Sequence, residues 1–258
     1  MRSRAGGLAA ALALMLIAGL GVQAWPAQAA VPGAVLPGAV IPGDLELGNS
    51  QQVIIVTARS WGSRTGTVTA YQVSAGGGWE PVLGPMRAML GDSGLIRAAQ
   101  RRQGTGKTPT GTFRIVSAFG RQPDPGTSMP YLRIDRDDAW PYHPKVPSTY
   151  NMLQNAPRSW RSYGGYVEHL WSYGVQYDYV AVMDYNLPGE PIRTGADGVR
   201  RTSKPADTAR GGGIFLHASD GKVTAGCIAV PVGQMRTIMR WLDPAKDPRI
   251  VVRVDPAD

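Results

Sequence analysis

The sequence predicts a mainly β domain of the α+β type, with one or two helices packed against the strands. Its 258 residues include 33 Gly and 21 Pro but only three Phe, a composition that favours short strands joined by many turns. Several short runs are rich in β-branched residues and end at Gly, Pro or Asn. Only one segment has a clear helical period, so strands are expected to dominate.

The first two predicted strands, QVIIVTA and GTVTAYQV, are expected to pair across the turn WGSRTG. PVGQMRTIMRWL, residues 231–242, is the clearest helix, because Pro suits a first turn and apolar residues recur at helical spacing. Its apolar stripe is expected to be core packing: Val232, Met235, Ile238, Met239 and Leu242. In chain order the predicted strands are 52–58, 66–73, 110–119, 177–185, 212–218 and 249–254.

Two long segments have weaker patterns. Residues 122–172 are rich in Pro, Tyr and Trp and read as mixed structure, with a short helix expected near Val167–Trp171. The stretch between Asn186 and Gly211 is polar and Gly-rich, and is expected to be a loop. It ends just before a predicted strand, where it could overhang a site.

The first residues have the pattern of an export signal. MRSR is basic, an uncharged run follows from Gly6 to Val22, and Ala27-Gln28-Ala29 matches a cleavage site. We therefore expect residues 1–29 to be a cleaved signal peptide; the alternative is an uncleaved membrane anchor. Residues 30–48, with the repeat VPGAV-LPGAV-IPG, are expected to be a Pro/Gly-rich linker, and 49–258 one catalytic domain.

Net charge points away from nucleic acid as a partner. The formal charge of +8 falls to +6 when the predicted signal and its two arginines are removed. Outside a cell, such a charge suits an anionic polymer such as a bacterial wall, although it also suits simple solubility. We expect a secreted protein of the cell wall or a periplasm-like space.

Cys227 is the only cysteine in the chain, so it cannot form an internal disulfide. A leftover thiol in an exported protein is either reactive or a buried small hydrophobe. Gly226 before it lets a carbonyl approach closely, and the small residues around it can form an anion-binding turn. Of the three histidines, His217 ends an apolar strand and is the best candidate base; His143 and His169 fit loop and packing roles. No short ligand spacing predicts a metal site.

Around these residues, HASDGKVTAGCIAVP resembles the active-site segment of the L,D-transpeptidases with a YkuD-type catalytic domain. That family has a histidine before an [S/T]-x-G-C motif, matched here by Thr224 to Cys227. GKTPTGTF resembles the family's TPxGxF segment, and EHLW and GGIFLH agree more weakly; the similarity runs from residue 52 to 254. It implies a β-sandwich-like fold with Cys and His on a shared groove.

The resemblance also implies a reaction and its residues. Cys227 would be the nucleophile that attacks a peptidoglycan tetrapeptide stem, and His217 the proton donor and acceptor. The Ala218 backbone carbonyl would orient His217, and N–H groups at Ala225, Gly226 and Cys227 would hold the oxyanion. The implied enzyme is an acyltransferase of cell-wall biogenesis and cell shape. It needs no cofactor and is expected to be a monomer, free of the membrane after signal cleavage.

A neighbouring pair, Tyr150 and Asn151, is expected to line the substrate groove. Two positions depart from the family pattern, because Ala225 and Ala229 stand where many members have His and Arg or Asn. Polar substrate contacts at these positions therefore do not carry over. Two alternatives stay open: a cysteine carboxypeptidase or wall hydrolase that uses water, and a wall-binding module with a degenerate site.

Overall fold

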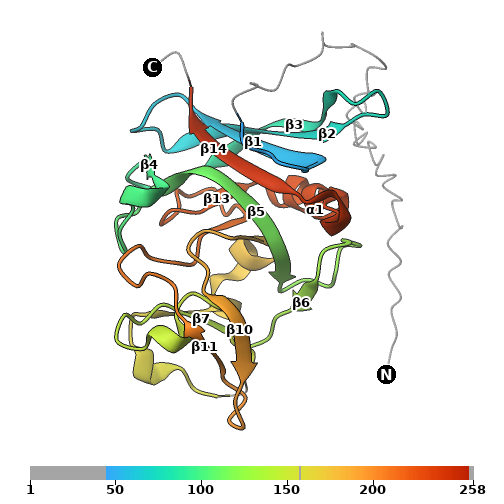
Figure 1. The fold of residues 1–258 in the computed structure, drawn as a ribbon. Helices are drawn as coiled ribbons and strands as arrows, with labels where there is room; N and C mark the ends of the chain where they lie inside the picture. Colours follow the sequence, from blue (N-terminus) through green and yellow to red (C-terminus); the bar gives the residue numbers. More distant parts are fainter. Residues whose placement is uncertain (1–44, 157, 256–258) are drawn as a thin grey trace, which may run out of the picture. The chain divides into compact units, whose positions relative to one another are not determined.

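Strands dominate the part of the chain described by this computed structural model, residues 45–156 and 158–255 (Figure 1). The predicted signal peptide and residues 30–44 of the predicted linker lie outside the described residues. Within the described residues, no helix is long and apolar enough to span a membrane. The strands are β1 (Gln52–Ala58), β2 (Thr65–Val73), β3 (Trp79–Met89), β4 (Leu95–Arg97), β5 (Thr108–Gly120), β6 (Tyr131–Arg133), β7 (Ala139–Pro141), β8 (Val167–His169), β9 (Val180–Met183), β10 (Gly189–Thr194), β11 (Arg200–Lys204), β12 (Phe215–Ala218), β13 (Ile228–Val230) and β14 (Arg249–Val254).

Helical segments are short. The α-helix is α1 (Val232–Trp241), which confirms the predicted helix at residues 231–242. The 3₁₀ segments are η1 (Ala98–Gln100), η2 (Pro147–Thr149), η3 (Arg161–Tyr163), η4 (Leu170–Tyr177) and η5 (Pro244–Lys246).

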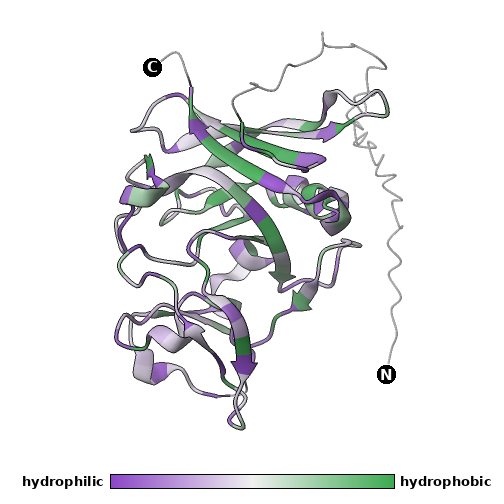
Figure 2. Cartoon of the chain, in the orientation of Figure 1, coloured by the Kyte–Doolittle hydropathy of each residue, from purple (hydrophilic) through white to green (hydrophobic). Residues whose placement is uncertain are grey.

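The main sheet has the strand order β14-β1-β2-β3-β13-β12-β9-β5-β4, with β6 added beside β5. β14 pairs in parallel with β1 and also antiparallel with β5, so the sheet closes on itself. β1 is an almost continuous apolar run and is buried along nearly its whole length, as expected for a strand covered on both faces. The hydrophobic colouring along β1 and β14 in Figure 2 marks the same region. The mainly β fold predicted from the sequence is confirmed.

Inside this sheet, the largest hydrophobic cluster joins side chains from the strands and from α1. Four residues of the predicted helical stripe, Met235, Ile238, Met239 and Leu242, are fully buried there. The fifth, Val232, is 40% exposed, because it is the first helical residue and faces solvent. Amphipathic packing of this kind contributes most of the stability of a short helix.

A second cluster lies on the other face of β12. Side chains alternate along a strand, so Leu216 and Ala218 join the first cluster, whereas Phe215 faces the second. Phe215 packs edge-on against Trp140, with ring centroids 4.8 Å apart. Cys227 belongs to this second cluster. The fold therefore places the thiol on an aromatic-lined face, away from the core beneath α1.

Most strand predictions are confirmed, and the pairing of β1 with β2 has the expected antiparallel form. β3 was not predicted, because WEPVLGPMRAM contains two prolines and a glycine that read as turns. It pairs with β2 through two register shifts and is largely exposed, which is where prolines are tolerated in a sheet.

Two other segments differ from expectation. The helix expected near residues 167–171 is wrong: β8 occupies its first part, pairs with β7, and leads into η4. The stretch between Asn186 and Gly211 is not all loop, because β10 and β11 form a hairpin within it. The hairpin is held by the buried Gln154 side chain, which bonds the Arg200 backbone N–H and carbonyl at 2.9 and 2.8 Å. A distant polar partner of this kind leaves no trace in the local sequence.

Candidate active site

Cys227 and His217 are brought together by two neighbouring parallel strands. β12 and β13 pair so that His217 lies opposite Ala229, and Cys227 lies at the level of Phe215. The Phe215 N–H points at the Cys227 sulfur, with 3.4 Å between the atoms. The thiol in turn donates to the Gly213 carbonyl at 3.2 Å. Both Cys227 and His217 line one cavity of about 560 Å³.

His217 is buried, and its Nδ1 lies 2.7 Å from the Ala218 carbonyl oxygen. A carbonyl can only accept, so Nδ1 carries the proton and Nε2 has the lone pair. The edge of the ring meets Tyr177, with centroids 5.7 Å apart. Burial lowers the pKa of His217, and the Ala218 carbonyl and the Asp220 charge oppose that shift only in part. At neutral pH this side chain is an uncharged base.

The thiol of Cys227 is also uncharged at rest. Burial raises its pKa to about 12, and the nearby Glu168 carboxylate adds to the shift. The Phe215 N–H and the Arg101 guanidinium act in the opposite direction. A raised thiol pKa beside a lowered imidazole pKa describes a neutral pair, not a preformed thiolate.

The turn before Cys227 depends on Gly226. Its φ of +135° is rarely adopted by other residues, and an added Cβ would lie 2.9 Å from the Lys107 carbonyl oxygen. The Thr224 hydroxyl donates to the Cys227 carbonyl at 2.7 Å and accepts the Gly226 N–H at 3.1 Å. Thr224 therefore closes the turn from the first position of the motif.

This geometry distinguishes the three N–H groups expected to hold an oxyanion. The Gly226 N–H is taken by the Thr224 hydroxyl. Within the described part of the chain, the N–H groups of Ala225 and Cys227 donate no hydrogen bond. These two are the donors available to an incoming carbonyl oxygen, and Ala225 and Gly226 both belong to the turn as expected.

The TPTGTF segment supports this turn from a distant part of the sequence. The Thr108 hydroxyl accepts the Gly91 N–H at 2.8 Å and lies 3.5 Å from the Cys227 carbonyl. The backbone around Gly91 bridges in parallel to Thr224. The TPTGTF segment and the TAGC motif are therefore neighbours in space, and contacts from Thr108 and Gly91 help to hold the turn before Cys227 in place.

Tyr150 and Asn151 are both buried and do not line the cavity at Cys227. The Asn151 Oδ1 accepts the Trp140 Nε1–H and the Gly213 N–H, each at 2.8 Å. Its Nδ2 donates to the carbonyls of Tyr185 and Asn186 at 3.2 and 2.6 Å. Asn151 thus helps to position Gly213, whose carbonyl accepts the hydrogen bond from the Cys227 thiol. It does so without lining the Cys227 cavity.

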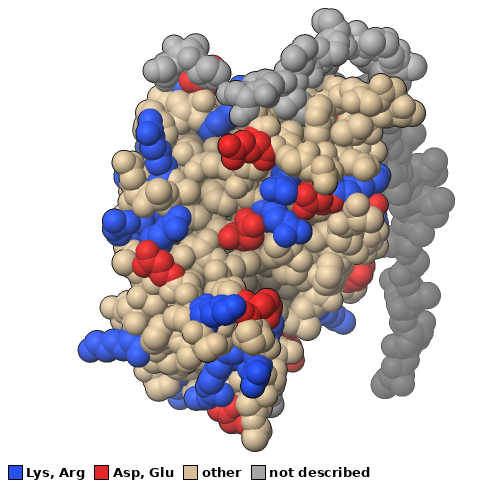
Figure 3. Space-filling view, viewed as in Figure 1, with Lys and Arg blue, Asp and Glu red and all other residues tan. Residues whose placement is uncertain are grey.

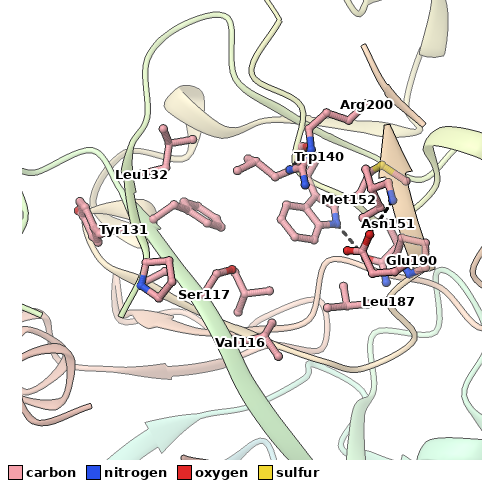
Figure 4. Close-up of a pocket in the computed structure, with 17 residues that line it drawn as sticks. Val116, Ser117, Tyr131, Leu132, Trp140, Asn151, Met152, Leu187, Glu190 and Arg200 are labelled. Carbon is pink, nitrogen blue, oxygen red and sulfur yellow. Dashed lines mark hydrogen bonds between the residues drawn. The ribbon is translucent and has the colours of Figure 1, made fainter. Parts of the chain in front are cut away.

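Asn151 instead borders a second cavity of about 550 Å³. Figure 4 shows its bond to Trp140 there, among the apolar side chains of Leu132, Met152 and Leu187. Glu190 and Arg200 of the β10–β11 hairpin are the charged lining residues. No residue of this hairpin lines the Cys227 cavity, so it does not overhang the site.

Three charged residues of the Cys227 cavity, Asp92, Arg101 and Glu168, were missed by sequence reasoning. Glu168 lies on β8 and accepts the Tyr177 hydroxyl at 2.5 Å. Burial raises the pKa of its carboxyl to about 7. Arg101, which follows η1, lines the cavity from another element. The sequence contains one weak indication for Glu168 and Arg101, which is that each lies in or near a segment that resembles the family. Glu168 is in EHLW, and Arg101 lies shortly before GKTPTGTF.

The remaining histidines lie elsewhere. His143 packs against Tyr166, with ring centroids 4.9 Å apart, and His169 is exposed at the end of β8. Among the described residues, no three His, Cys, Asp or Glu side chains gather as metal ligands. Basic and acidic side chains are interspersed over the face shown in Figure 3.

This site brings the single thiol and an imidazole into one cavity of a closed β sheet. The chain belongs to the L,D-transpeptidase catalytic domain family of the YkuD type, whose family model matches residues 51–252. No curated protein matches the chain.

Two solved structures are similar to part of the chain. They are crystal structures of the helical cell shape determining protein Pgp2 from Campylobacter jejuni and of a lysine-to-alanine mutant of it. Both are 16% identical, with TM-scores of 0.34 and 0.33, and each match covers 83% of this chain and 52% of the other. The chain thus spans about half the length of that protein.

Proposed function

We propose that the chain is an exported cysteine L,D-transpeptidase that forms 3→3 cross-links between peptidoglycan stem peptides through a thioester. The observation that carries this proposal is that Cys227, which directly precedes β13, and His217 on the paired strand β12 line one cavity. Membership of the family supplies the substrate class.

In the first half-reaction, Cys227 attacks the carbonyl after the third residue of a tetrapeptide stem. The thiol proton passes to Nε2 of His217 as the carbon–sulfur bond forms. The N–H groups of Ala225 and Cys227 hold the negative oxygen, and loss of one such donor in other enzymes costs on the order of 100-fold in rate. The intermediate collapses, the terminal D-alanine leaves with the proton from His217, and a thioester remains.

In the second half-reaction, the side-chain amine of another stem attacks the thioester carbonyl. His217 takes a proton from the amine as the new carbon–nitrogen bond forms. The intermediate collapses, the carbon–sulfur bond breaks, and the sulfur recovers the proton from His217. The Ala218 carbonyl keeps Nδ1 protonated throughout, so the same Nε2 serves both steps.

The test is product analysis with disaccharide tetrapeptide. The wild-type protein should give a 3→3 dimer and free D-alanine, and Cys227→Ala should give neither. A carbapenem should add covalently to Cys227, as seen in the intact mass. Absence of both the adduct and the dimer would contradict the proposal.

Two other outcomes correspond to the alternatives. Tripeptide without dimer would identify water as the acceptor and make the protein a carboxypeptidase or wall hydrolase. If wild type and Cys227→Ala bind sacculi equally and both leave muropeptides unchanged, the protein is a wall-binding module. Ala225 and Ala229, which replace polar residues of the family pattern, are the features that favour this last outcome.

Export is part of the proposal. We propose that residues 1–29 are removed as a signal peptide, that residues 30–48 form a linker, and that the mature protein works as a monomer in the wall or a periplasm-like space. The mass of the protein recovered outside the cell tests the cleavage site. A mass that includes the first 29 residues would instead indicate a retained anchor.

A further inference from the structure

Arg101 is a buried cation in the wall of the active-site cavity. It is only 3% exposed, yet it lines the same cavity as Cys227. Its Nε donates to the Lys107 carbonyl at 3.0 Å, and its Nη1 donates to the Arg210 carbonyl at 2.9 Å. These two bonds fix the plane of the guanidinium, so the direction of its remaining donor, Nη2, is fixed as well.

Nη2 of Arg101 has no acceptor among the described residues. It lies beside Gly226, where a Cβ added to that glycine would be 3.1 Å away. Gly226 directly precedes Cys227, so the free donor lies one residue from the proposed nucleophile. The effect of the guanidinium charge on the Cys227 thiol agrees with this closeness.

A buried guanidinium with free N–H groups favours an anionic partner. Burying a charge is costly unless it is paired, and the planar guanidinium suits a carboxylate especially well. No carboxylate of the described residues forms an ion pair with Arg101. Glu168 reaches the cavity beside Gly213, where its Oε1 would lie 3.3 Å from an added Cβ, and repels anions there. Asp92 also lines the cavity, and Arg101 is the one Lys or Arg among its described lining residues, so Arg101 is the group that can pair with an anionic ligand.

We propose that Arg101 is a specificity-determining residue that binds the terminal carboxylate of the donor stem peptide. The inference rests on the proposed function, in which Cys227 attacks the carbonyl just before the residue that leaves. The carboxylate of that residue is two bonds from the nitrogen that is expelled. A guanidinium fixed one residue from the nucleophile is well placed to hold it.

The experiment compares two donors that differ only at their end. One tetrapeptide stem has a free terminal carboxylate, and the other has a carboxamide in its place. Release of the last residue is measured with the exported protein. The wild type should favour the acid about 10- to 100-fold in kcat/KM, the range expected for a charge-assisted hydrogen bond.

Arg101→Met should lose this preference, because its kcat/KM should fall for the donor with the free carboxylate and change little for the donor with the carboxamide. Arg101→Lys keeps the positive charge but lacks the planar set of N–H donors that can bind both carboxylate oxygens, so it should retain part of the preference. Arg210→Met is the matched control, because Arg210 lies over the same Tyr185 ring at the same 5.6 Å but does not line the cavity. It should keep the wild-type preference. Equal losses on both donors would show that Arg101 serves the oxyanion instead, and would overturn the proposal.

A binding measurement separates this inference from the proposed reaction. Cys227→Ala should bind the acid stem more tightly than the amide stem in calorimetry, and the double variant with Arg101→Met should bind both alike. A preference in binding without any turnover would support the role of Arg101 and overturn the transpeptidase proposal. Equal binding of the two stems by Cys227→Ala would overturn the role of Arg101. This comparison leaves Arg101 intact, so it does not depend on the folding of an Arg101 variant.

Discussion

At the residue scale, the site is set by which atoms are already paired. The Ala218 carbonyl takes Nδ1 of His217, and the Thr224 hydroxyl takes the Gly226 N–H. Around the same cavity, the N–H groups of Ala225 and Cys227 and one guanidinium nitrogen of Arg101 donate no hydrogen bond to the described residues, and Nε2 of His217 has a lone pair. The chemistry we propose uses only these unpaired groups.

Gly226→Ala tests the turn before the nucleophile. Alanine at φ +135° is strained, and its Cβ would press on the Lys107 carbonyl, so the free energy of unfolding should fall by about 1–3 kcal/mol. Denaturant unfolding measures the loss, and carbapenem acylation of Cys227 should slow. Gly233→Ala is the control, because nothing lies within 4 Å of that position. If the two variants are equally stable, the turn does not require glycine.

Glu168→Gln tests the carboxylate beside the thiol. Above pH 7 the wild-type carboxylate is ionised and raises the pKa of Cys227, so the variant should lower that pKa. Iodoacetamide should then label Cys227 faster at pH 8. Glu190→Gln, in the other cavity, should leave the labelling rate unchanged. A slower rate in Glu168→Gln would contradict the sign of this interaction.

The same carboxyl makes stability depend on pH. Its pKa rises from 4.5 to about 7 on folding, so the folded protein holds this proton more tightly than the unfolded chain. The stability contributed by the bound proton is lost as pH rises from about 4.5 through about 7. Thermal unfolding from pH 4 to 8 should show this decline in wild type and a smaller one in Glu168→Gln. Parallel curves for the two proteins would argue against it.

At the element scale, separate segments are joined by a few polar side chains. Asn151 ties the region of β7 to the end of β9 and to the entry of β12 through its four hydrogen bonds. These segments carry no regular ladder between them at that point. The position of the Gly213 carbonyl, and hence of the thiol, follows from this one amide.

Asn151→Asp should therefore destabilise the protein strongly. The new carboxylate oxygen would face the carbonyls of Tyr185 and Asn186 in place of a donor, at a cost of about 3 kcal/mol. Denaturant unfolding measures this cost. Asn155→Asp is exposed and should change stability by less than about 0.5 kcal/mol. A wild-type midpoint for Asn151→Asp would show that the network does not hold the segments.

At the scale of the whole molecule, β14 closes the sheet. It pairs with β1 on one side and β5 on the other, and its own side chains Ile250 and Val252 are buried in the core. Without it, both neighbouring strands would have an open edge and the core beneath α1 would be exposed.

A chain that ends before Arg249 should therefore lose its cooperative thermal transition, followed by circular dichroism. A chain that ends after Asp255 should melt like the wild type, because it keeps every pair made by β14. If the shorter chain still melts cooperatively, closure by β14 is not needed for folding.

Local patterns predicted the elements that depend on neighbouring residues. β1, β2, β5, β9, β12, β14 and α1 were predicted because their apolar residues have the period of the element they form. Cys227 and His217 were singled out because a lone thiol and a strand-end imidazole are unusual in any exported chain. β3 and the β10–β11 hairpin were missed, because their pairing depends on β2 and on the Gln154 amide.

The sequence by itself determined the strand-rich fold, the family resemblance and the two candidate catalytic side chains, because each depends on local periodicity or on a short motif. Only the tertiary structure decided which groups surround them. In the structure, Arg101 and Glu168 line the Cys227 cavity. Asn151, which was expected to line the substrate groove, instead accepts the Gly213 N–H outside that cavity. Charge and hydrogen-bond partners come from distant segments, and the free energy of pairing depends on distance and burial in the folded chain.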